Sequence, residues 1–388
     1  MESVLSPPVD RFRPVVSNVF PEPRQVVLFP FMSKGHTIPI FHLGHLLLNR
    51  RLAVTVFTTP ANHPFIAQFL SNILPPLSPP FPQNVLGHDD IPVGTESTDK
   101  LPSMSLFHSF VLSTMLMQPD FKRALETLPR VSFMVTDWFL WWTAELASRF
   151  NIPRFIFSGM CYYAMTLCRA VMMDQLLFGP YPVFVDYWNL NCSPKSWFVG
   201  PLCQAELPKA QPEPHKKLTW VQWLDEKLDQ GNSVLYVAFG SQVKISPAQL
   251  KEIKIIVRDW VDQKGILMHG CVQGFLSHCG WKSVLESICA GVPILAWPMM
   301  AEQHLNARMV TEEIKAGLRI VTCDGSTRGF EKSDGLEKTV RQLMEGEMGK
   351  GVRKKVKELA ETAKKAVEEG GSSWRTLDLL IDEITCMQ

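Results

Sequence analysis

Residues Trp260–Gln303, WVDQKGILMHGCVQGFLSHCGWKSVLESICAGVPILAWPMMAEQ, alternate short apolar runs with glycine and proline breaks. The apolar run Val272–Ser277 predicts a strand, and Ser283–Ala290 predicts a helix that ends at a glycine. A second apolar run, Val292–Trp297, precedes another helical stretch, Ala301–Glu313. This order of strand, helix, strand and helix is typical of a parallel sheet with crossover helices.

The turn between the first of these strands and its helix is a candidate binding site. Ligands of parallel sheets bind at the carboxyl ends of strands, where helix N-termini present free N–H groups. His278, Gly280 and Ser283 lie at this point, and Glu286 follows one turn into the helix, where its carboxylate could accept two sugar hydroxyls. Ser283 and Glu286 also have the S-x-x-E spacing of a capping box, which needs no ligand. The spacing alone leaves both interpretations open.

The stretch resembles the sequence box of plant secondary-product UDP-sugar glycosyltransferases (glycosyltransferase family 1), over the full length of that box and without a gap. The resemblance implies the GT-B fold, in which two Rossmann-like α/β domains face a cleft. The residues that carry it are Trp260, Gln263, His278–Trp281, Ser283, Glu286, Gly291–Pro293, Trp297, Pro298 and Ala301–Gln303.

The same resemblance implies a nucleotide site in the second half of the chain. By that carry-over Trp260 stacks on the uracil and Gln263 lies beside it. His278 and Ser283 hold the diphosphate, and Glu286 holds the ribose.

The box also implies how the sugar is held. Trp281, Glu302 and Gln303 are the residues expected to contact it, and a glutamine at the end of the box is similar to the pattern of glucose-using members. One residue departs from the family, which has asparagine where this chain has Lys282. A cation at a helix N-terminus opposes the helix dipole, whereas beside a diphosphate it could pair with the ligand.

The composition of the whole chain is that of a globular protein with two or three domains. Of its 388 residues 46% are hydrophobic and 20% charged, and the net charge of +1 favours neither nucleic acid nor an anionic membrane. The nine cysteines are scattered and odd in number, as in a reducing compartment. We expect a monomeric cytoplasmic protein, without a signal peptide or an apolar run of ~18 residues.

No metal site or cofactor is expected beyond the donor substrate UDP-glucose. His269, Cys271, His278 and Cys279 are close in sequence, but their spacing fits no standard zinc site.

The chain opens with a strand, a helix and a strand, at Gln25–Phe31, Ile38–Asn49 and Leu52–Thr58. His36 is expected on the loop at the carboxyl end of the first strand. An imidazole there, with an ordinary pKa of ~6.5, suits proton abstraction near neutral pH. A merely exposed loop histidine is the alternative.

An apolar strand, Val131–Thr136, ends at Asp137. A carboxylate at that end of a strand can orient an imidazole. It can equally cap a helix that begins at Trp138. Of the tryptophans that follow, Trp138, Trp141 and Trp142, we expect at least two to pack in the core and the rest to line an acceptor pocket.

The first half also resembles the family, in the four segments Gly35–Pro39, Pro92–Asp99, Thr136–Trp142 and Phe157–Gly159. The resemblance implies that His36 is the general base and that Asp137 is its partner.

The donor half begins with the buried strand Ser233–Phe239, after which the resemblance places Ser241 facing phosphate. A helix is predicted over Ser246–Lys254, followed directly by a strand at Ile255–Arg258. The family has a further helix, strand and loop between them, so one to two β-α units of ~30 residues are missing. Phe178–Gly200 is likewise too short for the family pattern.

The resulting domain prediction has an acceptor domain at residues 1–205, a linker at 206–217, and a shortened UDP-sugar domain at 218–371. A last helix within residues 372–388 is expected to pack back on the first domain. Further helices are predicted at Ser103–Leu128, Trp220–Lys227, Ser333–Met344, Val352–Glu369 and Trp374–Ile384, with a strand at Leu318–Thr322.

The predicted activity is an inverting transfer of glucose from UDP-glucose to a hydroxyl of a small plant metabolite. The expected partners are thus a UDP-sugar and a small-molecule acceptor. One alternative is a catalytically impaired remnant that binds an acceptor or a partner only. A second is a hydrolase that uses paired carboxylates such as Asp137 and Glu145.

Overall fold

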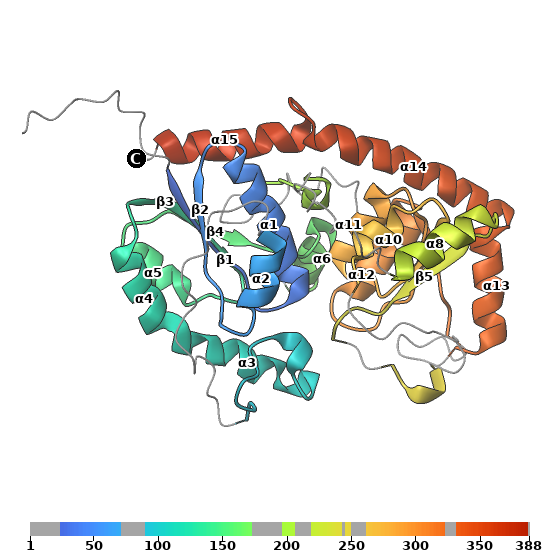
Figure 1. Ribbon diagram of the computed structural model, residues 1–388, viewed down its shortest axis with the longest axis horizontal. Helices are drawn as coiled ribbons and strands as arrows, with labels where there is room; N and C mark the ends of the chain where they lie inside the picture. The colour runs from blue at the N-terminus through green and yellow to red at the C-terminus, as the bar shows by residue number, and fades with distance from the viewer. Residues whose placement is uncertain are drawn as a thin grey trace, which may run out of the picture.

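The structure, a computed structural model, describes residues 24–70, 90–172, 196–205, 219–242, 245–249, 261–322 and 331–386. These residues form two α/β halves that lie side by side, each built on a four-stranded sheet (Figure 1). All described strand pairs in both sheets are parallel. The α/β fold predicted from alternating apolar runs and helical stretches is confirmed.

The sheet of the first half has the strand order β2-β1-β3-β4. Its central strand β3 is buried at every position, as expected of a parallel strand covered on both faces. The strands are β1 Gln25–Phe29, β2 Ala53–Val56, β3 Val131–Asp137 and β4 Arg154–Phe157. The α-helices are α1 Lys34–Leu48, α2 His63–Leu70, α3 Phe107–Ser113, α4 Gln118–Thr127, α5 Thr143–Arg149 and α6 Tyr162–Met172.

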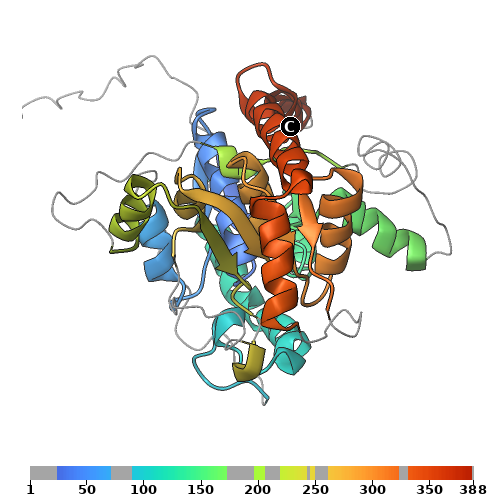
Figure 2. The ribbon, with the colours of Figure 1, turned by 90° about the vertical axis from the view of Figure 1, so that its right-hand side faces the viewer.

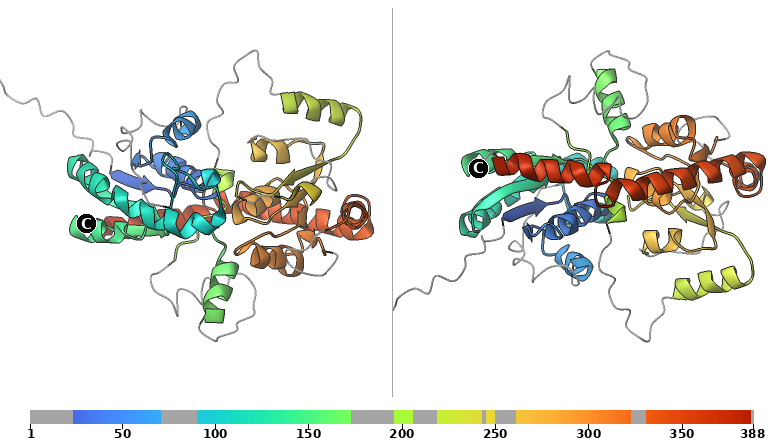
Figure 3. Two further views of the ribbon diagram at one scale, coloured as in Figure 1. Left: turned by 90° about the horizontal axis from the view of Figure 1, so that it is seen from below. Right: turned by 90° about the horizontal axis from the view of Figure 1, so that it is seen from above.

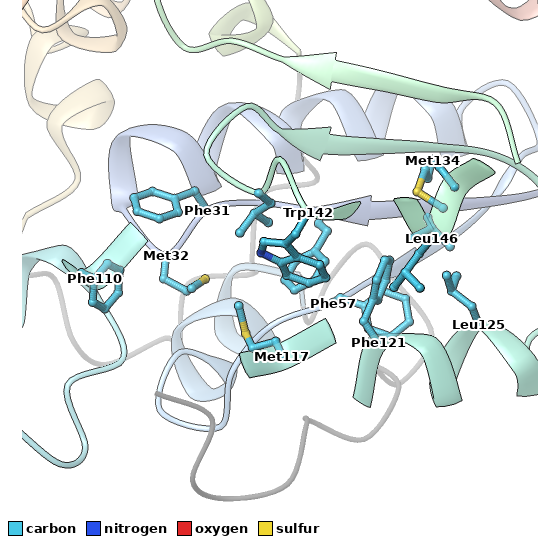
Figure 4. Packing of buried hydrophobic residues seen from close by; sticks show 14 of the residues in the cluster. Phe31, Met32, Phe57, Phe110, Met117, Phe121, Leu125, Met134, Trp142 and Leu146 are labelled. Atoms are coloured by element: carbon cyan, nitrogen blue, oxygen red, sulfur yellow. The ribbon is translucent and has the colours of Figure 1, made fainter. Parts of the chain in front are cut away.

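One aromatic cluster fills the space between this sheet and helices α3 to α5 (Figure 4). Trp142 lies in it with 2% of its surface exposed, and its ring meets those of Phe29 and Phe121 edge-on at 5.8 and 5.9 Å. Its indole N–H donates to Thr114 Oγ1 at 2.9 Å, so the polar end of this buried side chain is satisfied.

Trp142→Ala should lower the free energy of unfolding by about 3–5 kcal/mol, because it removes a large buried ring and leaves a cavity. Trp141→Ala is the matched control: Trp141 is 49% exposed, and its loss should change stability by less than about 0.5 kcal/mol. Urea denaturation measures both. Equal effects of the two substitutions would contradict the packing described for Trp142.

The sheet of the second half has the order β5-β6-β7-β8, and Figure 2 shows this half in front, with helices on either side of its strands. Within the described residues β5 pairs with β6 along one edge and with no strand along the other. All five residues of β5 are only partly buried, whereas β7 is wholly buried. The strands are β5 Val234–Ala238, β6 Val272–Ser277, β7 Ile294–Ala296 and β8 Gly317–Arg319.

Two long helices connect the halves along one side of the molecule. Helix α14 lies over the second half and α15 over the first, as the view from above shows (Figure 3). From α15, Leu377, Leu380 and Ile384 enter the same apolar cluster as residues of β1 and α1. The second half contains α8 Thr219–Asp229, α10 Gln263–Leu267, α11 Trp281–Cys289, α12 Gln303–Arg308, α13 Ser333–Met344 and α14 Glu347–Val367, and the chain then returns to the first half with α15 Ser372–Cys386.

Several predicted elements differ from the observed ones. The single helix predicted over Ser103–Leu128 is broken into 3-10 and α segments, and the helix at Ala301–Glu313 ends in a π-helical turn, Met309–Glu313. The predicted strand Ile255–Arg258 and the linker at 206–217 lie outside the described residues, as does most of Phe178–Gly200.

Candidate active site

A cleft of about 1980 Å³ lies between the two halves and is lined by residues of both. Its first wall is formed around the carboxyl ends of β1 and β3 and the start of α1. Its second wall is formed around the carboxyl ends of β5 and β6 and the start of α11. The lining includes His36, Asp137, Ser241, Gln263, His278, Trp281, Lys282, Ser283, Glu286, Glu302 and Gln303.

His36 and Asp137, 101 residues apart in sequence, meet on the first wall. His36 Nδ1 lies 2.8 Å from Asp137 Oδ2. A carboxylate only accepts hydrogen bonds, so Nδ1 carries the proton and Nε2 of the neutral ring has a free electron pair. This is the arrangement of a base held by an orienting carboxylate.

The surroundings of His36 favour its protonated form. Burial lowers the pKa of His36, but the charge and hydrogen bond of Asp137 and the charge of Glu302 together raise it above the ordinary value. The ring also contacts Phe31 and Phe139, with centroids 5.8 and 5.5 Å away. A quarter of the His36 side chain stays exposed (26%), whereas Asp137 is 1% exposed. The base is therefore accessible from the cleft, whereas its partner is almost completely covered.

Two expectations about this wall need correction. His36 is not on a loop, because α1 begins at Lys34 and His36 belongs to its first turn. Asp137 does not cap a helix that begins at Trp138, since α5 begins at Thr143. Its Oδ1 instead accepts from the N–H of Phe139 at 3.0 Å, which fixes the turn after β3 while Oδ2 holds His36.

The three tryptophans after Asp137 are also placed differently from the prediction. Only Trp142 is buried; Trp138 and Trp141 are 48% and 49% exposed, and of the three only Trp138 lines the cleft. The prediction that at least two would pack in the core is wrong. Glu145 is exposed and accepts from Gln118 at 3.0 Å outside the cleft lining, so it forms no carboxylate pair with Asp137.

On the second wall, the ring of His278 lies between two glycines. Its Nδ1 donates to the carbonyl of Ala238 at 3.3 Å. A Cβ on Gly240, whose φ is +77°, would lie 2.7 Å from Nε2, and one on Gly280 would lie 2.6 Å from it. Burial, together with the charge of Lys282, lowers the pKa of His278 to about 4, although the hydrogen bond to Ala238 raises it. The imidazole is therefore neutral at pH 7.

Gly280→Ala should lower the free energy of unfolding by about 1–3 kcal/mol. Its backbone angles, φ −57° and ψ 137°, suit alanine, so the cost arises from the new methyl group against His278. Gly351→Ala is the control: no heavy atom lies within 4 Å of its Cβ position in α14, and helix propensity predicts a gain of up to about 1 kcal/mol. Denaturant titration that found Gly280→Ala as stable as wild type would contradict this packing.

Helix α11 begins at Trp281 after Gly280, and no described side chain caps it. Its first N–H groups are thus available to an anion in the cleft. Ser283 is the third residue of the helix and not its cap, so the capping-box interpretation of Ser283 and Glu286 is wrong.

Glu286 is instead bound by side chains. Gln263 Nε2 donates to its Oε2 at 2.7 Å and to Ser283 Oγ at 3.0 Å. Lys282 Nζ lies 2.6 Å from Glu286 Oε1. The carboxylate expected to hold a ribose is therefore in the cleft wall, 4% exposed, with a partner on each oxygen.

Glu302 and Gln303 line the cleft at the start of α12. Gln303 Oε1 accepts from the N–H groups of Met299 and Met300, each at 3.0 Å, which fixes the orientation of the amide. Trp281 is half-buried beside them and Ser241 is exposed after β5. Trp260, the residue expected to stack on the uracil, lies outside the described residues.

Gln242 and His42 are two of the cleft residues that sequence reasoning missed. Gln242 Nε2 donates to Thr98 Oγ1 at 2.9 Å, which connects the loop after β5 to the first half. Its place next to Ser241 was the only available signal. His42 lines the cleft from α1, and burial together with the charges of Lys264 and Lys282 lowers its pKa to about 3. No pattern in the sequence set it apart from other helical histidines.

Within the described ranges, no three His, Cys, Asp or Glu side chains are grouped as metal ligands would be. None of the helices in that part of the chain has the length and apolar character needed to cross a membrane.

Comparison with known proteins identifies the relatives of the chain. A sequence profile of the family "UDP-glucoronosyl and UDP-glucosyl transferase" matches residues 215–356. The chain is 43% identical to UDP-glycosyltransferase 90A1 of Arabidopsis thaliana over 464 aligned positions, covering 92% of this chain and 96% of that protein. It is 40% identical to UDP-glycosyltransferase 90A2 of the same plant, covering 92% and 97%.

The fold has a solved counterpart in the crystal structure of Arabidopsis thaliana UGT89C1 complexed with UDP. The TM-score is 0.77 at 25% identity, over 93% of this chain and 99% of that chain. The alignment with UDP-glycosyltransferase 90A1 has 464 positions, which is more than the 388 residues of this chain. UDP-glycosyltransferase 90A1 therefore contains residues that this chain lacks. The fold is therefore GT-B, and the chain is a shortened member that belongs to the plant UDP-glycosyltransferases of glycosyltransferase family 1.

Proposed function

We propose that this protein transfers glucose from UDP-glucose to a hydroxyl group of a small plant secondary metabolite, with inversion at the anomeric carbon. The observation that carries the proposal is the 2.8 Å contact of His36 with Asp137 on one wall of a cleft whose other wall contains Glu286, Glu302 and Gln303. Gln303 supports glucose through its resemblance to glucose-using members of the family.

The acceptor class is supported by the aromatic character of the first wall. Phe31, Phe107, Trp138 and Phe139 line it beside His36. The crystal structure of UGT89C1 complexed with quercetin, at 26% identity and a TM-score of 0.76, contains a flat polyphenol. We propose an acceptor of that kind, with one ring against these side chains and a hydroxyl at His36 Nε2.

In the proposed reaction, His36 Nε2 removes the proton of the acceptor hydroxyl. The oxygen attacks the anomeric carbon as the bond from that carbon to the diphosphate oxygen breaks, and UDP leaves. Asp137 stabilises the imidazolium that forms. The free N–H groups at the start of α11 stabilise the charge that develops on the diphosphate. We propose that no metal or further cofactor takes part, and that the protein is a cytoplasmic monomer.

The test is a transfer assay with purified protein, quercetin, and either UDP-glucose or UDP-galactose. We expect a quercetin glucoside and equimolar UDP, with at least tenfold less product from UDP-galactose. Release of free glucose without a glucoside would contradict the proposal, as would a preference for galactose.

A second candidate function is binding of a UDP-sugar or an acceptor without transfer. Two observations favour it: strand β5 is only partly buried, and the chain is shorter than its relative. A weakly supported second wall would misplace the donor, and an error of ~1 Å can cost about a hundredfold in rate. It predicts that UDP raises the unfolding temperature while no acceptor tested yields a glycoside.

A further inference from the structure

Lys282 is the residue at which this chain departs from the family box, and the structure shows its partner. Its ammonium group lies 2.6 Å from Oε1 of Glu286, one turn later in α11. The Glu286 side chain is 4% exposed and that of Lys282 is 21% exposed. The pair thus lies at the surface of the cleft with its carboxylate buried and its cation reachable from the cleft.

Helix stability does not explain the position of this lysine. Lys282 is the second residue of α11, where a cation opposes the helix dipole. A lysine placed four residues before a glutamate is also the weaker orientation of such a pair. A function in ligand binding explains why a cation stands here at some cost to the helix.

The charge of Lys282 extends over the region where an anionic ligand is expected. It lowers the pKa of His278 on the same wall and the pKa of His42 on the opposite wall. His278 is itself neutral at pH 7, so the ammonium group of Lys282 supplies positive charge that the imidazole does not. The uncapped N–H groups of α11 face the same region.

We propose that Lys282 binds the diphosphate of the donor while Glu286 holds its ammonium group in place. The inference rests on the proposed function in taking a UDP-sugar as the ligand. An ammonium group has three N–H donors, so one can remain on Glu286 while others reach phosphate oxygens. Glu286 retains further electron pairs for ribose hydroxyls. As the sugar leaves, Lys282 then stabilises the charge that gathers on UDP.

The experiment compares UDP with uridine, which lacks phosphate, on wild type and on Lys282→Asn. Loss of a charge-assisted hydrogen bond should weaken UDP binding roughly ten- to hundredfold and leave uridine binding within about threefold. Lys282→Arg keeps the charge and should recover most of the UDP affinity. Lys355→Asn, the control, removes one positive charge from an exposed ion pair on α14 and should leave the affinities for UDP and uridine unchanged.

Titration calorimetry at low and high salt provides a second readout. The affinity of wild type for UDP should fall more steeply with salt than that of Lys282→Asn. Lys282 does not bind the diphosphate if Lys282→Asn binds UDP as tightly as wild type does. The same conclusion follows if the substitution lowers the affinities for UDP and for uridine by the same factor. Absence of UDP binding to wild type would instead overturn the proposed function itself.

A second, independent observation concerns Cys203 and Cys289, whose sulfur atoms lie 3.5 Å apart. Cys203 belongs to the 3-10 turn Leu202–Gln204, and Leu202 is anchored in the apolar cluster of the first half. Cys289 is the last residue of α11 in the second half. A bond between them would join the halves covalently at the C-terminal end of the helix that carries Lys282 and Glu286.

We propose that these two thiols form a disulfide with oxidised glutathione as the electron acceptor. The S–H of Cys203 donates to Cys289, which lowers the pKa of the Cys289 thiol. The Cys289 thiolate attacks oxidised glutathione and releases one glutathione thiolate. Cys203 then attacks the Cys289 sulfur and releases the second. The pair loses two electrons and two protons, and both appear in two molecules of reduced glutathione.

Mass spectrometry of wild type treated with oxidised glutathione should show a peptide cross-link between positions 203 and 289. The unfolding temperature should rise by several degrees on oxidation and return to its initial value when dithiothreitol reduces the bond. Cys203→Ser and Cys289→Ser should each abolish the cross-link, whereas Cys386→Ser, at an exposed cysteine, should not. Persistent glutathione on Cys289, or thiols that stay reduced, would overturn the assignment.

Discussion

His36→Ala should reduce kcat for glucosyl transfer by about 10²–10⁴-fold, the contribution typical of a positioned general base. The acceptor hydroxyl must lose its proton during transfer, and this substitution removes the imidazole that we propose accepts it. UDP affinity should remain within about twofold, because His36 belongs to the first wall, whereas we propose that the nucleotide binds to the second.

The matched control is His108→Ala, since His108 is exposed on α3 and does not line the cleft. Steady-state kinetics and UDP titration on the three proteins separate a chemical defect from a binding defect. An unchanged kcat in His36→Ala would show that another group removes the proton. A loss of UDP affinity in parallel with kcat would place His36 in donor binding.

Asp137→Asn should lower kcat by roughly 10²–10⁴-fold although the fold is retained. The asparagine carbonyl can still accept from Phe139, but its amide donates to His36 Nδ1. That contact places the proton of the neutral ring on Nε2, the atom that must accept a proton from the acceptor.

The pH dependence provides an independent check of this pair. Asp137 and Glu302 raise the pKa of His36, so the acid limb of kcat/KM should have its midpoint above the ordinary ~6.5. Activity requires the neutral ring and should therefore rise with pH through that midpoint. In Asp137→Asn the midpoint should shift to lower pH. The double variant with His36→Ala should be no worse than His36→Ala alone; additive losses would contradict a shared function.

The contact between His36 and Asp137 also makes the stability of the fold depend on pH. The folded-state pKa of His36 lies above its unfolded value, so the pair contributes fully to stability below pH ~6.5. The contribution is lost as pH rises through the folded-state pKa. Activity and this part of the stability therefore change in opposite directions with pH.

Much of this molecule follows from local patterns in the sequence. The strand Val272–Ser277 and the helix Ser333–Met344 are observed with the predicted bounds, which shows that local sequence patterns are sufficient to define them. His36 and Asp137 were each placed at the carboxyl end of a strand, β1 and β3. These strands are neighbours in a parallel sheet, so their ends meet.

The features that the sequence could not predict depend on side-chain contacts over distance. The sequence suggested only a diphosphate as a partner of Lys282, and the side-chain positions in α11 show that it reaches Glu286. Trp138, Trp141 and Trp142 are alike in sequence, and the turn fixed by Asp137 determines which of them enters the core. The proximity of Cys203 to Cys289 depends on how the two halves pack.

The predicted shortening also has a structural counterpart. The sequence predicts that the missing units belong between the helix at Ser246–Lys254 and the strand at Ile255–Arg258, in the part of the chain that follows β5. In the described residues β5 has one neighbour and is half-buried throughout. Length that a relative has and this chain lacks would fit along the edge of β5 that has no neighbour among the described residues. The described residues of β6 and α11 are both regular.

A crystal structure of the protein with UDP and a non-transferable fluoro-glucose donor tests the central claim most directly. We predict that the ribose hydroxyls bind to Glu286 and that the diphosphate lies at the start of α11. The anomeric carbon should face His36 Nε2 across the cleft. A nucleotide bound elsewhere, or a sugar directed away from His36, would contradict the account.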